Sequence, residues 1–239
     1  MIILAIDTST SMATVAISAK EKIVAESLFN SERTLSVRLI SEIERLVVTA
    51  GLAIADIDLF AASIGPGSFT GVRGGVATVQ GLALATGKPC AGFSSLALLA
   101  MNFPHSLYPV CALLDARKSE VYAALYDCST PHPTAILSDC VMSPAHFLDQ
   151  LASATDKPVI FAGEGALCYH ELITSRMLDQ AIFAPFPFHL SRASNGTLLA
   201  LDLFNRGDLL EPSRLLPVYL RKSDAEINRS LKFPTASHN

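Results

Sequence analysis

The sequence predicts a two-lobed α/β protein, and three observations support this fold class. Strand-like and helix-like runs follow one another in the order βββαβα over the first 86 residues. The pattern that opens the chain recurs with an offset of 108 residues. A Gly/Pro turn at residues 65–73, GPGSFTGVR, joins an apolar strand to a long helix with almost no charge.

Each element of the first half has its own local signal. Residues 2–6, 13–18 and 22–29 are β-branched runs between polar turns and predict a three-stranded antiparallel meander. Residues 33–50 carry apolar side chains at the spacing of one helix face, and Gly51 ends this helix. Residues 57–64 predict a further strand, and residues 70–86 predict a second helix.

The second half repeats the opening of the first. Asp7 and Asp115 both follow an apolar strand, and Ser11 and Ser119 fall at matching positions after them. Residues 159–165 form another strand that ends in a Gly turn before a helix. We therefore expect an N-terminal lobe at 1–106 and a smaller C-terminal lobe at 107–239, with the last helix and the tail packing back on the first lobe.

The turn at 65–73 is the most informative local motif. Gly65 and Gly67 permit positive φ, Pro66 stiffens the turn, and Ser68 or Thr70 can cap the following helix. Free backbone N–H groups at such a helix start can hold an anion or an acceptor of a partner protein. The motif is not a P-loop, because no Lys-Ser/Thr pair follows the glycines. The alternative is an ordinary capped strand–helix turn.

Carboxylates at strand ends suggest a nucleotide or phosphate cleft. Phosphoryl-transfer folds place metal-binding acids at such positions, facing each other across a cleft. The alternative is that each Asp caps its own loop, and the segment after Asp7 lacks the glycine that lets backbone approach a phosphate. The candidate cleft residues are Asp7, Thr8, Ser9, Gly65, Gly67, Ser68, Asp115 and Arg117.

Two helices of the first half carry more apolar surface than one sheet can cover. Small residues line one face of the helix at 70–86, and such a face lets two helices approach closely. The helix at 33–50 has apolar side chains off its main face, including Val37, Ile40 and Val48. We expect a partner interface here, with cover by the second lobe as the alternative. Its candidate residues are Leu39, Ile40, Ile43, Gly71, Arg73, Gly74, Gly75, Thr78, Val79 and Leu82.

Composition restricts the class of protein. The 239 residues are 50% hydrophobic and carry a formal charge of −4, so the chain as a whole does not favour nucleic-acid binding. The basic stretch at 214–232 is expected to be a solvated tail.

Five scattered cysteines without a C-x-x-C pair predict reduced thiols in the cytoplasm, and we expect no signal peptide and no membrane span. The histidines have no metal-ligand spacing, and no G-x-S-x-G elbow occurs.

These motifs resemble the TsaB (YeaZ) family, the non-catalytic subunits of the bacterial machinery for tRNA threonylcarbamoyladenosine. The resemblance covers nearly the whole chain, and the turn at 65–73 is its most specific part. The other matching segments are ILAIDTST at 3–10, QGLA at 80–83, DAR at 115–117 followed by EVY at 120–122, and PVYLR at 217–221.

The resemblance implies a fold of the actin/sugar-kinase/Hsp70 type, with two ribonuclease H-like lobes that each hold a mixed five-stranded sheet flanked by helices. It implies a chain without catalytic residues or a cofactor of its own, since the partner subunits bind ATP and metal. The implied partners are the catalytic paralogue TsaD, which pairs through N-lobe helices, and the ATPase TsaE. The isolated chain is expected to form a homodimer and to meet tRNA only through the complex, which modifies the adenosine beside the anticodon in tRNAs that read A-starting codons.

Two other functions remain open from the residues alone. An ATP-dependent kinase of the same fold would use Asp7 to hold Mg²⁺ and Asp115 as base. A metallopeptidase, which an older family label of glycoprotease suggests, would need bound zinc.

Overall fold

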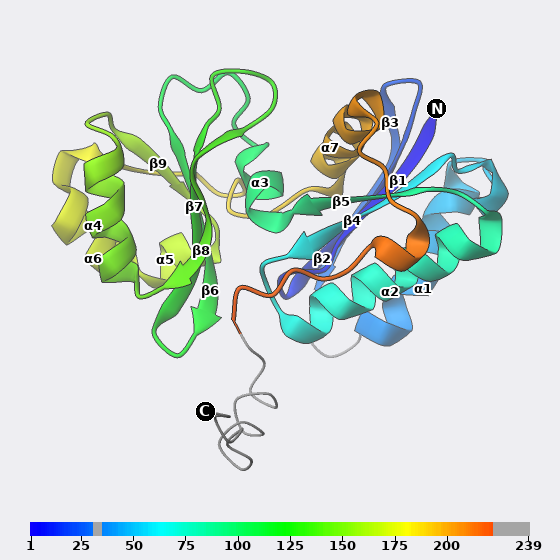
Figure 1. Cartoon of the computed structure of the whole chain (residues 1–239), viewed down its shortest axis with the longest axis horizontal. Helices are drawn as coiled ribbons and strands as arrows, with labels where there is room; N and C mark the ends of the chain where they lie inside the picture. Colours follow the sequence, from blue (N-terminus) through cyan, green and yellow to red (C-terminus); the bar gives the residue numbers. More distant parts are fainter. Residues whose placement is uncertain (31–34, 222–239) are drawn as a thin grey trace, which may run out of the picture.

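The computed structural model describes residues 1–30 and 35–221. Two lobes lie side by side, and each consists of one sheet with helices packed on its faces (Figure 1). The first lobe is built from β1 (Ile2–Asp7), β2 (Met12–Ala19), β3 (Lys22–Asn30), α1 (Leu35–Thr49), η1 (Ile54–Asp56), β4 (Leu59–Gly65), α2 (Phe69–Thr86), β5 (Cys90–Ser94) and α3 (Ser95–Ala100). Residues 33 and 34 of the predicted first helix lie outside the described residues.

The second lobe repeats this order with one more helix. Its elements are β6 (Val110–Arg117), β7 (Glu120–Asp127), β8 (Thr134–Met142), α4 (Pro144–Ala154), β9 (Val159–Ala162), α5 (Glu164–Cys168), α6 (His170–Met177), η2 (Leu178–Gln180) and β10 (Ala181–Phe183). The chain then continues through α7 (Ala193–Arg206) and the short η3 (Pro212–Arg214).

The two sheets have the same topology. The strand order is β3-β2-β1-β4-β5 in the first and β8-β7-β6-β9-β10 in the second. In each, the first three strands pair antiparallel and the last two add in parallel. The expected fold class, an actin/Hsp70-like pair of lobes with mixed five-stranded sheets, is confirmed. The predicted meander and the internal duplication are confirmed as well.

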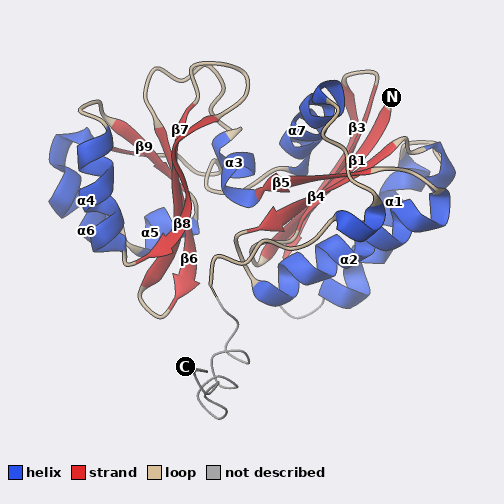
Figure 2. Cartoon of the chain, viewed as in Figure 1, coloured by secondary structure: helices blue, strands red, loops and turns tan. Residues whose placement is uncertain are grey.

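Helices cover both faces of each sheet because the central strands are apolar on both sides. In the first lobe, α1 and α2 bury one face through a core that includes Leu46, Val76 and Phe60. In the second, α4, α5 and α6 bury the corresponding face around Phe147 and Phe161. Figure 2 shows these helices on the outer side of each sheet.

The remaining faces are covered by an exchange of helices between the lobes. Helix α3 follows the first sheet, but its Leu96 and Leu99 pack against strands of the second. Helix α7 follows the second sheet, but its Ala200 packs against the first, beside Ile3 and Phe93. Each lobe therefore needs an element that the other half of the chain supplies.

Residues 210–221 continue this return and run along α2, where we name them the C-terminal strap (Figure 1). Leu215 of the strap is fully buried in the core of the first lobe. The strap covers one side of α2, for which the sequence analysis favoured a partner protein and kept cover by the second lobe as the alternative. Residues 222–239, including most of the predicted basic tail, lie outside the described residues.

Candidate cleft and partner-facing surface

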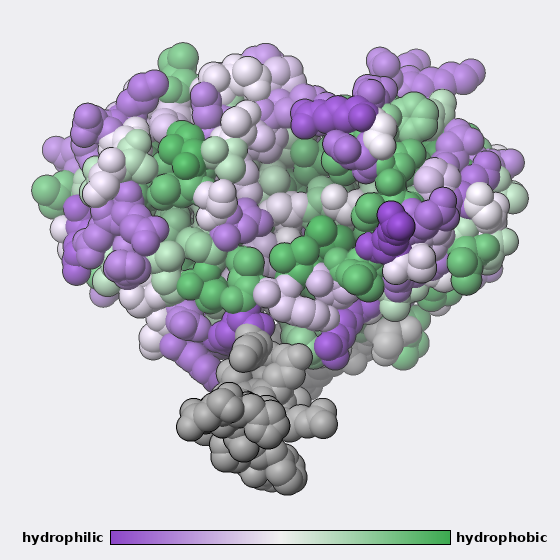
Figure 3. Space-filling view, viewed as in Figure 1, coloured by the Kyte–Doolittle hydropathy of each residue, from purple (hydrophilic) through white to green (hydrophobic). Residues whose placement is uncertain are grey.

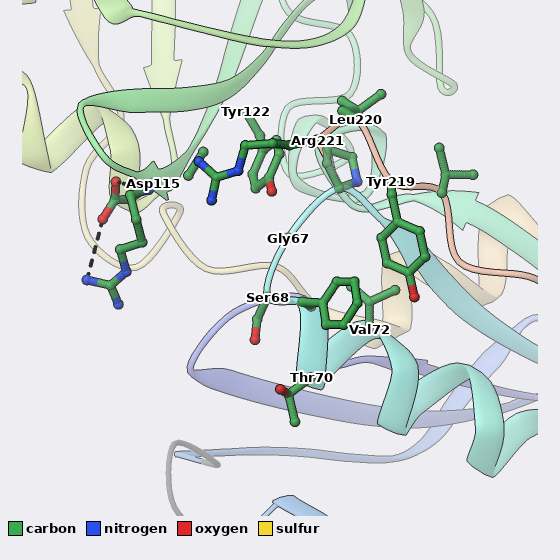
Figure 4. A pocket seen from close by; sticks show the side chains of 14 residues that line it. Gly67, Ser68, Thr70, Val72, Asp115, Tyr122, Tyr219, Leu220 and Arg221 are labelled. Atoms are coloured by element: carbon green, nitrogen blue, oxygen red, sulfur yellow. Dashed lines mark hydrogen bonds and ion pairs between the residues drawn. The ribbon is translucent and has the colours of Figure 1, made fainter. Parts of the chain in front are cut away.

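A cavity of about 490 Å³ lies between the two lobes (Figure 4). Three segments line it, which are the turn and first residues of α2, the β6–β7 hairpin, and the end of the C-terminal strap. Apolar side chains gather on both lobes beside the boundary between them (Figure 3). Of the predicted cleft residues, the structure brings Gly67, Ser68, Asp115 and Arg117 together in this cavity.

Asp7, Thr8 and Ser9 do not reach the cavity, which corrects the sequence-based expectation for them. All three are buried, and the turn before α2 packs directly on top of them. The Ser68 N–H donates to the Ser9 carbonyl at 2.7 Å, and the Thr8 hydroxyl donates to the Gly71 carbonyl at 2.8 Å. The segment that looked like a phosphate cup is therefore sealed beneath the start of α2.

The Asp7 carboxyl is held inside the first lobe by local hydrogen bonds. Its Oδ1 accepts from the Ser9 N–H at 2.9 Å and from the Ser63 hydroxyl. Burial raises the pKa of Asp7 above its ordinary value, because loss of water disfavours the charged form, and the hydrogen bonds from Ser63 and Ser9 partly oppose this. Asp7 therefore caps its own loop.

Gly65 is also covered. Its φ of +112° lies in the region that favours glycine, and a Cβ there would meet the Val218 carbonyl oxygen at 2.7 Å. The Val218 N–H donates to the Ile64 carbonyl at 2.7 Å, which holds the strap against the end of β4. Gly65 thus allows the strap to pass close to the backbone, and it leaves no free surface for a phosphate.

Asp115 occupies the position that matches Asp7 but opens on the cavity. Its Oδ1 accepts from the Arg117 N–H at 2.9 Å, as Asp7 does from the residue two further on, and its Oδ2 lies 3.6 Å from Arg117 Nη1. Figure 4 shows this ion pair at the edge of the cavity. Burial raises the pKa of nearby Glu164, and the negative charge of Asp115 adds to the effect.

An aromatic and cationic cluster borders the cavity on its strap side. The sequence analysis placed Arg73 in the partner interface and gave no role to Phe69 or Tyr219, which line the cavity. The Arg73 guanidinium lies 3.7 Å from the Phe69 ring centroid, and its Nε donates to the Tyr219 hydroxyl at 2.6 Å. The rings of Phe69 and Tyr219 have centroids 4.9 Å apart. The sequence signal that could have identified this cluster is that its residues belong to two distant motifs, GPGSFTGVR and PVYLR.

Ser68 caps α2, and the glycines that follow it pack inward. The Ser68 Oγ accepts from the Gly71 N–H at 3.3 Å, so Ser68 and not Thr70 is the N-cap. A Cβ on Gly71 would lie 2.0 Å from the Thr8 carbonyl oxygen, and a Cβ on Gly75 would lie 2.3 Å from the Thr8 hydroxyl. Gly71 and Gly75 are therefore used for close packing on Thr8, in the loop after β1, and not for a partner.

Several predicted interface residues belong to the core, which corrects that part of the prediction. Leu39, Ile43 and Val79 are at most 2% exposed, and Gly71 and Gly75 are buried against Thr8. The α1 periodicity correctly placed Leu39 and Ile43 toward the sheet, so they cannot also face a partner. Arg73 is exposed, but Phe69 and Tyr219 of its own chain engage its guanidinium.

The rest of the predicted interface lies at the surface. Ile40 is 51% exposed, while Gly74, Thr78 and Leu82 are partly buried. Three apolar side chains on the same two helices are more exposed than Ile40, namely Val37 at 75%, Val48 at 70% and Leu84 at 73%. An outward apolar surface on α1 and α2 therefore exists, but it is formed by other residues than the glycine face.

Within the described ranges, 1–30 and 35–221, no group of three or more His, Cys, Asp or Glu side chains is arranged to hold a metal ion. Over the same part of the chain, none of the helices has the length and hydropathy needed to cross a membrane. Cys90, Cys111 and Cys128 are buried free thiols, Cys140 is half-buried, and Cys168 is exposed.

Comparison with known proteins shows similarity along almost the entire chain. The family model described as TsaD, tRNA N6-adenosine threonylcarbamoyltransferase, matches residues 22–229. The tRNA threonylcarbamoyladenosine biosynthesis protein TsaB of Bacillus subtilis is 29% identical over 226 residues, which are 95% of this chain and 96% of that protein. TsaB of Escherichia coli is 39% identical over 129 residues, 53% of this chain and 55% of that protein. The solved structure of YeaZ from Pseudomonas aeruginosa is 31% identical, covers 92% of this chain and 99% of its own, and superposes with a TM-score of 0.77.

Proposed function

Because this chain belongs to the TsaB (YeaZ) proteins of the TsaD-like family, we propose that it is a non-catalytic subunit required to form threonylcarbamoyladenosine in tRNA. The reaction in this proposal transfers the threonylcarbamoyl group to the adenosine beside the anticodon of tRNAs that read A-starting codons. The catalytic subunit is the paralogue TsaD, and the complex works in the cytoplasm.

One observation carries the non-catalytic role, and it is the burial of Asp7. A carboxylate that holds a metal or a phosphate-bound cation must reach the ligand. In this chain Asp7 is 0% exposed and lies behind the turn before α2, where burial raises its pKa. The carboxylate at the end of the central strand of the first lobe therefore accepts hydrogen bonds from its own lobe and does not line the cavity.

The apolar surface on α1 and α2 supports pairing with TsaD through the first lobe. Val37, Ile40, Val48 and Leu84 are all more than half exposed, and exposed apolar side chains of this size on neighbouring helices favour association. The same surface would let the isolated chain pair with itself. We further propose that the ATPase TsaE joins this pair and that tRNA is bound by the assembled complex.

The proposal is tested by reconstitution with purified TsaD, TsaE, tRNA and the threonylcarbamoyl adenylate. The complete set should modify tRNA, and this chain alone should show no turnover. Ile40→Asp with Leu84→Glu should abolish pairing and modification, because each places a charge in the proposed interface. Leu167→Glu is the matched control on the second lobe, where the leucine is 54% exposed, and should leave both intact. Modification by this chain without TsaD, or normal pairing of the double variant, would refute the proposal.

An ATP-dependent phosphotransferase is the alternative, and the open position of Asp115 on the cavity favours it. Calorimetry with ATP and Mg²⁺ on the isolated chain distinguishes the two functions. Tight binding with steady ATP turnover, both lost in Asp115→Asn, would support the phosphotransferase.

A further inference from the structure

The C-terminal strap is anchored to the first lobe from Leu210 to Tyr219. Leu210 and Cys90 exchange two backbone hydrogen bonds of 2.8 Å, so the strap begins as an addition to the edge of the sheet. The Gln80 side-chain amide of α2 then donates to the carbonyls of Pro212 and Leu215, at 3.0 Å each. The strap therefore moves with the first lobe as one body.

Near its end the strap leaves α2 and crosses to the second lobe. Tyr219 is its last described contact with α2, through Phe69 and Arg73. Two residues later, Arg221 Nη1 lies 2.9 Å from Oε2 of Glu120, at the start of β7. The two side chains are 24% and 35% exposed, so water screens this ion pair less than an open surface pair.

The lobes are also joined at a second place, around α3. Ser94, the N-cap of α3, donates to Asp139 of β8, and the Tyr126 hydroxyl donates to the other oxygen of the same carboxylate at 2.6 Å. Leu96 and Leu99 bury this junction against the second sheet. Figure 1 shows α3 and the strap on opposite sides of the space between the lobes.

We propose that the strap is a clamp that fixes the separation of the two lobes, with the Arg221–Glu120 ion pair as its releasable catch. The junction at α3 is large and apolar and serves as the hinge, while the catch is a single polar contact. The strap supplies Val218, Tyr219, Leu220 and Arg221 to one wall of the cavity, and the hairpin beside Glu120 supplies another. Release of the catch therefore widens the cavity. This inference is independent of the proposed function.

Spin labels on the two lobes test the clamp in the full-length chain. Cys168 is exposed on the second lobe, and Ala55→Cys adds an exposed site within η1 of the first lobe. Cys140→Ala is added to the background to remove the half-buried thiol. Pulsed dipolar spectroscopy should give one narrow distance distribution for the parent chain. Glu120→Gln and Arg221→Gln should each shift it to longer distances and broaden it, because either change removes the charge pair.

Two matched variants decide between the clamp and a general loss of stability. The exchange of charges in Glu120→Arg with Arg221→Glu should restore the narrow distribution. Asp149→Asn breaks the 2.6 Å ion pair with Arg176 inside the second lobe and should leave the distribution unchanged. The inference is wrong if the two single variants keep the parent distribution, or if the charge exchange fails to restore it while circular dichroism shows a folded chain.

Discussion

Replacing Gly71 with alanine adds a methyl group where the structure leaves no room for one. The new Cβ would lie 2.0 Å from the Thr8 carbonyl oxygen and 3.3 Å from the Ser68 side chain. This buried backbone carbonyl cannot rotate away as a flexible side chain does, so α2 or the loop after β1, which holds Thr8, must shift. Gly81 on the same helix offers a matched control, because nothing lies within 4 Å of its added Cβ.

The expected magnitudes follow from packing and helix propensity. Overpacking a well-packed core costs about 1–3 kcal/mol, and moving α2 also stretches the hydrogen bonds that hold its start. Alanine gains roughly 1 kcal/mol over glycine in a helix interior, and less in the first turn, where Gly71 lies. We expect Gly71→Ala to lower the free energy of unfolding by about 1–3 kcal/mol and Gly81→Ala to raise it by up to roughly 1 kcal/mol.

The assay is urea unfolding followed by circular dichroism, with a thermal scan as a second measure. At this chain length each 1 kcal/mol shifts the melting temperature by about 2–4 °C, so the two variants should move in opposite directions by measurable amounts. The denaturant slope should stay unchanged, which keeps the comparison to stability alone. Equal stability of Gly71→Ala and Gly81→Ala would show that α2 does not pack on the loop after β1, and that Asp7 is not covered by the turn before α2.

Three further predictions concern single side chains. Because the pKa of Asp7 in the folded chain lies above its ordinary 3.8, the folded chain binds this proton at a higher pH than the unfolded chain does. The free energy of unfolding, measured relative to Asp7→Asn, should therefore increase as pH falls from neutral toward 3.8. A free-energy difference that does not change with pH would contradict this. Ser94→Ala removes both a helix cap and a hydrogen bond to a carboxylate, and should lower the free energy of unfolding by about 2–4 kcal/mol. Ser143→Ala removes only the cap of α4 and should lower it by about 1 kcal/mol. Equal losses in urea unfolding would argue against the junction at α3. Tyr219→Phe keeps the ring and removes the 2.6 Å hydrogen bond from Arg73, so it should lower the free energy of unfolding by about 0.5–1.5 kcal/mol. An unchanged melting temperature would count against this hydrogen bond.

The sequence by itself predicted the elements and their class, because those depend on local periodicity and on turn residues. Apolar spacing and the positions of Gly, Pro and Ser predicted the three-stranded meander, a strand at 57–64 and a helix at 70–86 capped by Ser68 or Thr70. The structure has this strand at Leu59–Gly65 and this helix at Phe69–Thr86, with Ser68 as its cap. The repeat that relates Asp7 to Asp115 also predicted two lobes of the same topology.

The tertiary structure alone decided which of these residues are accessible. Spacing cannot tell a helix face that packs within its own lobe from one that faces a partner. Gly71 and Gly75 of α2 proved to face inward, because Thr8 lies against them. Nor does a pair of matching carboxylates reveal that one is sealed and the other open, since that depends on where the turn before α2 settles. The strap joins residues more than a hundred positions apart, and only the folded chain brings Arg73 to Tyr219 and Glu120 to Arg221, because such contacts leave no periodic trace in the sequence.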